Sequence, residues 1–243
     1  MSKESLIPGE IFPYTQIPET GHKYFLSDDN PTLLMASGTH GDENEIVPLV
    51  EEVVWKYREQ LPPFMFIPEI SPSACELNTR KNKDGLDLNR SFTVPPPADE
   101  VKAMMDIWSN YKFGVFLTFH TDPKFTDFYL YDHYKDTGHK KRRLDTTESF
   151  ALLKKDILSI GINMYNGIDD SEDPTLGYEV KDGYICWPMS KRTNNHSMDY
   201  WLIMDTGIVK QVINPEIPGK ATLEEKSIII ESIIRRLILG EEE

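Results

Sequence analysis

Residues 32–54 read TLLMASGTHGDENEIVPLVEEVV, and this stretch predicts a strand, a polar loop and a helix in succession. Leu33–Ala36 is a short apolar run that stops at a Ser-Gly pair, which is typical of a buried strand entering a loop. Apolar residues then recur at helical spacing over residues 43–60. A strand that leads into a helix in this way is the unit from which α/β folds are built.

The rest of the chain continues the alternation. We expect further strands over residues 64–67, 113–119, 127–131 and 208–213, and helices over residues 99–111, 146–160, 197–204 and 222–239. We expect long loops over residues 71–93 and 168–193, and residues up to 21 are expected to wrap the surface. The pattern predicts one α/β domain over residues 1–243, with a mixed, mostly parallel central sheet and helices on both faces. In such sheets the site lies beyond the carboxyl ends of the strands.

Composition narrows the class of protein. The chain has 243 residues, 39% of them hydrophobic and 27% charged, which is the profile of a soluble globular protein. Its net charge of −14 argues against a nucleic-acid partner, because phosphate binding needs clustered Lys and Arg. There is no leader-like apolar segment at the N-terminus and no run of about 20 apolar residues, so we expect no membrane span. With two cysteines and no disulfide framework, we expect a cytoplasmic protein.

The first group of candidate functional residues follows the strand at Leu33–Ala36. His40 and Glu43 are three residues apart, a spacing that lets an imidazole nitrogen and a carboxylate reach one metal ion. By itself this pair is also compatible with a surface histidine beside a glutamate that favours a helix N-terminus.

A second histidine, His120, follows the apolar run 113–119. A lone histidine after such a run is more often structural than a ligand. However, two strands that each deliver a histidine to the same edge of a sheet, together with Glu43, offer three ligands. Three protein ligands and one open position are typical of a catalytic zinc. The absence of closely spaced cysteine pairs excludes a structural site of four thiolates.

Two further segments carry polar groups. The loop NTRKNKDGLDLNRSF over residues 78–92 concentrates Arg and Asn, either as a solvated turn or as an anion pocket, because guanidinium groups pair with carboxylates. Glu216 lies between two prolines after the last predicted strand. It is either an exposed glutamate in a turn or a general base at the sheet edge that carries the metal.

Together these four segments resemble the zinc carboxypeptidase family of metallopeptidases. The matching pieces are HGDE at residues 40–43, R-x-N-x-x-G-x-D-L-N-R-x-F at residues 80–92, the Phe-His pair at residues 119–120, and the late strand that ends at Glu216. They occur in the family's order and span most of the chain. The length, the GTHGDEN run and the E-x-P context of Glu216 are most similar to the murein peptide amidase branch, which trims peptides that carry a diamino acid from cell-wall fragments. The H-x-x-E, D-L-N-R and H-T elements are also similar to the aspartoacylase and succinylglutamate desuccinylase branch.

The resemblance implies a metal site. His40, Glu43 and His120 would hold one Zn²⁺ per chain, and Asp87 would accept a hydrogen bond from a ligand histidine. Zinc with two imidazoles and a carboxylate makes hydroxide available near neutral pH.

The resemblance also implies the roles of the residues around the metal. Arg80 would polarise the scissile carbonyl, and Asn89 and Arg90 would hold the terminal carboxylate of the substrate. Glu216 would act as general base and then as general acid. The expected substrate is a small peptide, cleaved next to its terminal carboxylate, or an N-acyl amino acid, cleaved by a deacylase with the same core. A catalytically silent binding module is the third reading, and the presence of all these residues disfavours it.

The chain departs from the family pattern in its later part. Many carboxypeptidases place a tyrosine on a mobile loop before the base, where this chain has Lys191, so Tyr184 or Tyr200 would substitute or no tyrosine is needed. Residues 168–193 have no clear match to the amidases. An alignment on the S-x-D-Y motif at residues 197–200 places Met198 near the specificity pocket, which favours an apolar side chain of the substrate. Lys191 and Arg192 instead favour an acidic one.

Overall fold

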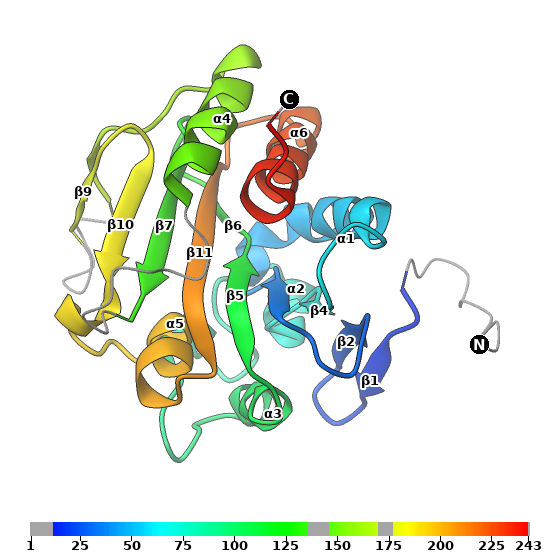
Figure 1. Ribbon diagram of the computed structural model, residues 1–243. Coiled ribbons are helices and arrows are strands. Elements are labelled where there is room, and N and C mark those ends of the chain that lie inside the picture. The colour runs from blue at the N-terminus through cyan, green and yellow to red at the C-terminus, as the bar shows by residue number, and fades with distance from the viewer. Residues whose placement is uncertain (1–11, 136–145, 170–176, 243) are drawn as a thin grey trace.

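A nine-stranded sheet forms the centre of the computed structural model, which describes residues 12–135, 146–169 and 177–242 (Figure 1). Its strands are β1 (Thr15–Ile17), β2 (His22–Leu26), β3 (Leu33–Ala36), β4 (Phe64–Ile67), β5 (Phe113–Thr118), β6 (His120–Asp122), β7 (Tyr129–Tyr134), β10 (Tyr184–Pro188) and β11 (Val209–Pro218). Two short strands, β8 (Gly167–Ile168) and β9 (Glu179–Val180), form a separate antiparallel pair.

Parallel pairing dominates the middle of the sheet. The strand order is β1-β2-β4-β3-β5-β11-β7-β10, and β6 pairs with the far end of β11. β3 is parallel to β4 and β5, and β11 is parallel to β5 and β6. The pairs β1–β2, β2–β4 and β7–β11 are antiparallel. The predicted mixed, mostly parallel sheet is confirmed.

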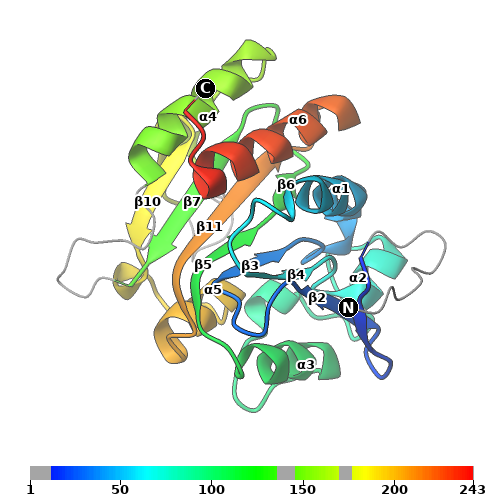
Figure 2. The same cartoon turned by 45° about the vertical axis from the view of Figure 1, so that its right-hand side comes forward.

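Helices cover both faces of this sheet (Figure 2). On one face lie α1 (Val47–Tyr57), α4 (Thr146–Ser159) and α6 (Leu223–Ile233), the last extended by the π-helix η5 (Ile234–Leu239). On the other lie α3 (Asp99–Trp108) and α5 (Met198–Tyr200), the latter extended by the π-helix η4 (Trp201–Asp205). The short helix α2 (Pro72–Leu77) packs against η1 (Gly41–Ile46), and the single turns η2 (Leu88–Arg90) and η3 (Met189–Lys191) lie in loops.

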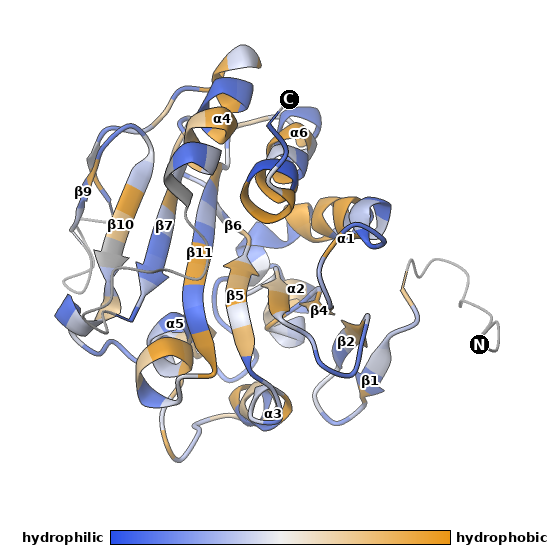
Figure 3. Ribbon diagram, viewed as in Figure 1, coloured by the Kyte–Doolittle hydropathy of each residue, from blue (hydrophilic) through white to orange (hydrophobic). Residues whose placement is uncertain are grey.

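The strand β3 explains why the sheet needs cover on both sides. All four of its residues are buried. Leu33 and Met35 belong to the core under α1 and α6, whereas Leu34 and Ala36 belong to the core over α3. Alternate residues of a strand point to opposite faces, so a wholly apolar strand is stable only between two layers. Figure 3 shows the hydrophobic residues gathered in the central strands and on α1 and α6.

Several predicted boundaries differ from those observed. The expected loop 71–93 contains α2 and η2, and β2 lies in a region with no expected strand. The expected loop 168–193 is wrong in part, because β10 lies within it and pairs with β7; its residues 170–176 lie outside the described ranges. β2 and β10 are stabilised by pairing with β4 and β7, which periodicity along the chain does not report. The short helices α2 and η2 pack against η1 and α5.

The last strand is longer than predicted. β11 continues past Pro215 to Pro218, because β6 pairs with it on one side and β7 on the other. The extra residues bring Glu216 into the sheet. Within the described ranges, no helix is both long and apolar enough to cross a bilayer.

A close backbone approach holds the loop after β3 against α2. The N–H of Gly41 donates to the carbonyl of Thr79 at 2.9 Å. A Cβ added at Gly41 would lie 1.8 Å from the carbonyl oxygen of Ala74, which is far inside contact distance. Only glycine allows the two segments to meet here.

We therefore expect Gly41→Ala to lower the free energy of unfolding by about 3 kcal/mol or more, because the backbone must shift to relieve the overlap. Gly85→Ala is the matched control: its φ of +76° is unfavourable for alanine, but a Cβ there meets nothing within 4 Å. The control should cost only about 1–2 kcal/mol. Urea unfolding of the two variants measures the difference, and equal losses would contradict the close approach.

Candidate metal centre

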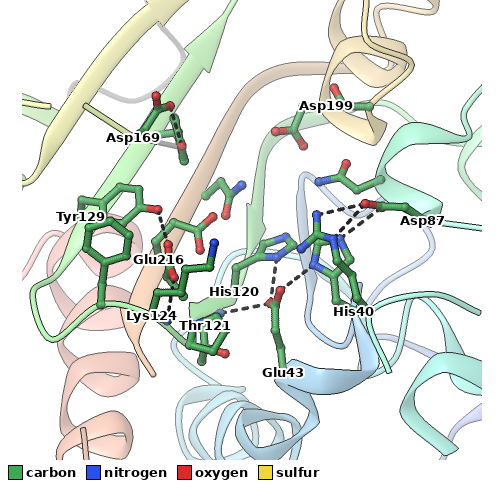
Figure 4. Close-up of a pocket in the computed structure, with 18 of the residues that line it drawn as sticks. His40, Glu43, Asp87, His120, Thr121, Lys124, Tyr129, Asp169, Asp199 and Glu216 are labelled. Carbon is green, nitrogen blue, oxygen red and sulfur yellow. Dashed lines mark hydrogen bonds and ion pairs between the residues drawn. The ribbon is translucent and has the colours of Figure 1, made fainter. Parts of the chain in front are cut away.

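Three buried side chains form the centre of the site. His40 precedes η1, Glu43 lies within it, and His120 begins β6. Nδ1 of His40 lies 2.5 Å from Oε1 of Glu43, and Nδ1 of His120 lies 3.0 Å from Oε2 (Figure 4). One nitrogen or oxygen atom from each residue lies within 4.8 Å of the others. This is a compact set of two imidazoles and one carboxylate.

The outer contacts of His40 fit a metal ligand. Its Nε2 lies 3.3 Å from Oδ1 of Asp87, and an ionised carboxylate can only accept, so this nitrogen carries the proton. With a proton on each ring nitrogen, His40 also donates from Nδ1 to Oε1 of Glu43. A carboxylate behind a histidine is the usual support of a metal ligand, and a metal ion would take the place of the Nδ1 proton. The donor set fits a divalent metal such as zinc.

The pKa shifts of His40 and Glu43 also fit a site for a cation. Burial lowers the pKa of His40, but the carboxylates of Glu43 and Asp87 outweigh it and raise this pKa to about 9. Burial raises the pKa of Glu43, but His40 and His120 together hold it well below its usual range. The backbone N–H of Thr121 also donates to Oε2 of Glu43 at 3.1 Å. The site is thus organised around an ionised carboxylate and a cation.

Asp87 joins the trio to Arg80. Its Oδ2 accepts from Nε of Arg80 at 3.1 Å and lies 3.0 Å from Nη2, while its Oδ1 faces His40. Burial raises the pKa of Asp87, but His40 and Arg80 outweigh it and hold the carboxyl ionised. A single carboxylate therefore orients both a candidate ligand and the guanidinium that faces the cavity.

Hydrogen bonds of Asn82 fix the loop that carries Arg80 and Asp87 and join it to α3. Oδ1 of Asn82 accepts from the N–H groups of Asp84 and Leu86, each at 3.0 Å, which closes a turn. Nδ2 of Asn82 donates to the buried Glu100 at 3.0 Å. Glu100 on α3 also accepts from the N–H of Ser73 at 2.9 Å. This glutamate therefore joins the loop to the first turn of α2, and sequence reasoning did not identify it.

Asn89 and Arg90 lie beside this loop in η2. Oδ1 of Asn89 accepts from the N–H of Met198 at 3.1 Å, which leaves its Nδ2 as a donor. Arg90 donates from Nη1 to the carbonyl of Asn89 at 2.9 Å. Both residues line the cavity next to Arg80. A donor amide with a guanidinium is suited to a carboxylate.

Glu216 lies beside His120 in the sheet. The two residues are direct partners in the parallel pairing of β11 with β6, so their side chains leave the sheet on the same side. Burial raises the pKa of Glu216 well above its ordinary value, and the charge of Glu43 adds to this effect. A carboxylate with a raised pKa is a stronger base.

One cavity of about 780 Å³ gathers all the candidate residues. It is lined by the sequence-predicted His40, Glu43, Arg80, Asp87, Asn89, Arg90, His120 and Glu216. It is also lined by residues that sequence reasoning did not assign, among them Tyr129, Tyr131, Tyr165, Asp169, Asp199 and Asn214. The S-x-D-Y motif at residues 197–200 was the one sequence signal that could have identified Asp199.

The tyrosines proposed from sequence lie elsewhere. Tyr184 donates to Asp132 at 2.6 Å and, like Tyr200, does not line the cavity. Tyr129 and Tyr131 do line it, and Tyr129 donates to Asp122 at 3.0 Å. Burial, with Glu216 adding to it, raises the pKa of Tyr129, so the phenol stays a neutral donor.

The two suggestions for the specificity pocket are also revised. Met198 is fully buried in the core over α3 and does not line the cavity, so it gives no apolar wall. Lys191 is exposed and does not line it either, whereas Arg192 does.

Comparison with known proteins places the fold. No family model matches the sequence, and no curated protein matches it. A candidate metallopeptidase of Shewanella baltica has a TM-score of 0.68 at 17% identity, over 90% of this chain and 81% of its own. A metallo-carboxypeptidase of Burkholderia cenocepacia has a TM-score of 0.56 at 12% identity, over 88% and 59%. This is a metallocarboxypeptidase-like fold.

The same fold extends to deacylase-type proteins. An aspartoacylase family protein of Mesorhizobium loti has a TM-score of 0.54 at 19% identity, over 91% of this chain and 63% of its own. The resemblance inferred from four sequence segments is confirmed at the level of the fold. At these identities the activity has to be argued from the site itself.

Asp87 should control metal affinity. We expect Asp87→Asn to weaken Zn²⁺ binding about 10–100-fold, because the amide is uncharged and no longer fixes His40. Competition with a chromophoric chelator measures the dissociation constant. Asp84→Asn, an exposed change in the same loop, is the control and should bind as the wild type does. Equal affinities for the two variants would remove Asp87 from the support of the metal.

Proposed function

We propose that the chain is a zinc-dependent hydrolase that cleaves an amide bond next to a terminal carboxylate, as one catalytic domain over residues 1–243. The observation that supports this proposal is the register of β11 with β6, in which Glu216 is the direct partner of His120, a member of the candidate ligand trio. A base next to a three-ligand site with an adjacent donor pocket is the arrangement that amide hydrolysis needs.

His40, Glu43 and His120 would hold the zinc ion, which supplies a Lewis acid and lowers the pKa of a water molecule toward neutrality. Asn89 and Arg90 bind the terminal carboxylate and so fix the position of the scissile bond. The guanidinium of Arg80, held by Asp87, donates to the carbonyl oxygen as negative charge develops there.

Glu216 moves the proton. It takes a proton from the attacking water as the new C–O bond forms, and it delivers that proton to the nitrogen as the C–N bond breaks. Its raised pKa favours the first of these transfers, because the carboxylate then holds a proton more strongly.

A second candidate is a zinc deacylase that acts on N-acyl amino acids. It is favoured by the likeness of the fold to the aspartoacylase family protein. The two activities share the metal, the base and the carboxylate pocket, and they differ in what lies on the acyl side of the bond. Hydrolysis of short peptides and of N-acyl amino acids, measured side by side by amine release, separates them. Cleavage of N-acyl amino acids alone would contradict the peptidase.

Loss of the base should stop turnover and spare the metal. We expect Glu216→Gln to lower kcat by about 10²–10⁴-fold, the range of general base catalysis, while zinc content stays that of the wild type. The control is Glu224→Gln, an exposed change on α6 that should keep full activity. Steady-state kinetics with metal analysis checks both. Normal turnover by Glu216→Gln would contradict the role of Glu216 as the general base.

The carboxylate pocket should be visible in substrate choice. We expect a peptide with a free C-terminal carboxylate to be cleaved at least about 100-fold faster, as kcat/KM, than the same peptide with a C-terminal amide. The amide offers one oxygen instead of two and no charge to the guanidinium. Equal rates for the pair would show that Asn89 and Arg90 do not hold the substrate carboxylate.

A further inference from the structure

Asp199 is a buried carboxylate that faces the cavity without a partner. It is only 4% exposed, lines the cavity and, within the described residues, makes no hydrogen bond or ion pair. Figure 4 shows its side chain on the opposite side of the cavity from Glu43, pointing toward the space above His120. A carboxylate without water or a partner is strongly unfavourable, so its position calls for a donor from outside the chain.

Arg192 supplies a buried positive charge at the same end. It is 9% exposed, and its Nη1 donates to Nε2 of His133 at 3.1 Å. Its guanidinium lies 5.5 Å from the centre of the Tyr178 ring. Its Nε has no hydrogen-bond partner in the part of the chain that the structure describes. Arg192 and Asp199 share the cavity wall, yet no ion pair joins them.

Asn214 adds a second acceptor. It is 7% exposed, and its Oδ1 has no partner among the described residues. Asn214 lies two positions before Glu216 on β11, so the two side chains leave the strand on the same side. The cavity wall thus presents two acceptors without a partner, Asp199 and Asn214, and one cationic donor, Arg192. The nearby carboxylate of Asp169 already accepts from Tyr131 and from the N–H groups of Gly177 and Tyr178.

The position of Asp199 relative to the pocket proposed for the terminal carboxylate indicates which part of a substrate would contact Asp199, Arg192 and Asn214. Asn89, proposed to hold the terminal carboxylate, accepts from the backbone of Met198, the residue before Asp199. The carboxylate pocket and Asp199 are therefore neighbours. The side chain of the residue whose carboxylate is held is the portion of the substrate that extends toward Asp199, Arg192 and Asn214.

We propose that this end of the cavity binds a primary carboxamide, so that the enzyme selects a leaving residue with a glutamine-like side chain. The inference rests on the proposed function. The two N–H groups of a carboxamide match the acceptors of Asp199 and Asn214, and its carbonyl oxygen accepts from Arg192. The group is uncharged, so it adds no net charge to a wall that already holds Arg192, Asp199 and Asp169.

Other side chains fit this end less well. A carboxylate side chain meets the like charge of Asp199, and an ammonium side chain meets that of Arg192. An apolar side chain leaves both buried charges unpaired, and sites built from buried polar groups reject such analogues strongly.

The test uses zinc-loaded protein and four peptides that differ only in the C-terminal residue: glutamine, glutamate, methionine or lysine. We expect kcat/KM for the glutamine peptide to exceed that for each of the others at least tenfold. Cleavage of the series without a preference for glutamine overturns this inference and leaves the proposed function standing. Cleavage of none of them counts against the proposed function.

Binding provides a readout that does not need turnover. Calorimetry with free glutamine, glutamate, methionine and lysine should give the tightest binding for glutamine, again by at least tenfold. Equal affinities, or tighter binding of another of the four, overturn the inference even when no peptide is cleaved.

Variants locate the preference. Asp199→Leu should reduce the glutamine-to-methionine ratio in both kcat/KM and affinity to about one, because the acceptor is gone. Lys191→Leu, at an exposed position that does not line the cavity, is the matched control and should keep the ratio. A ratio that survives in Asp199→Leu would contradict the role of Asp199.

Discussion

The carboxylate of Glu43, held between the imidazoles of His40 and His120, is the interaction on which the rest of the site depends. The three residues come from two segments that are adjacent only because β3 and β5 are neighbours in the sheet. Both strands are buried, and their apolar side chains fix the ends from which the polar groups emerge. The packing of the two cores therefore positions a set of polar side chains that would otherwise be hydrated separately.

Around this centre, single side chains serve more than one partner. Asp87 faces His40 with one oxygen and Arg80 with the other, so the proposed metal ligand and the proposed donor to the substrate carbonyl share one support. Glu100 has a similar role farther from the metal ligands, because it holds Asn82 and Ser73 and with them the loop. Such sharing makes the site rigid, and it makes the effect of changing any one member extend to the others.

The sequence predicted those features of the site that depend on residues close together in the chain. The ends of Leu33–Ala36 and of the run before His120, with the spacing of His40 and Glu43, were sufficient to place candidate ligands at one sheet edge. Glu216 was placed at that edge as well, although the strand that carries it was predicted to stop before Pro215. The order of these motifs along the chain, more than any one of them, indicated the fold.

What the sequence did not reveal depends on contacts between distant segments. Glu100 is an ordinary helix glutamate until tertiary structure places it under the Arg80 loop. Arg192 lies in a stretch with no regular pattern. Asp199 lies in a predicted helix whose pattern does not say that its carboxylate lines the cavity, and Met198, which local alignment favoured for the pocket, is buried in the core.

The most direct test of the central claim is X-ray absorption at the zinc edge of the loaded protein, combined with metal analysis. The account predicts one zinc per chain, coordinated by two imidazole nitrogens and by oxygen, and no sulfur. It further predicts that Glu43→Ala loses this site. Less than one zinc per chain after loading, a sulfur ligand, or an unchanged spectrum in Glu43→Ala would contradict it.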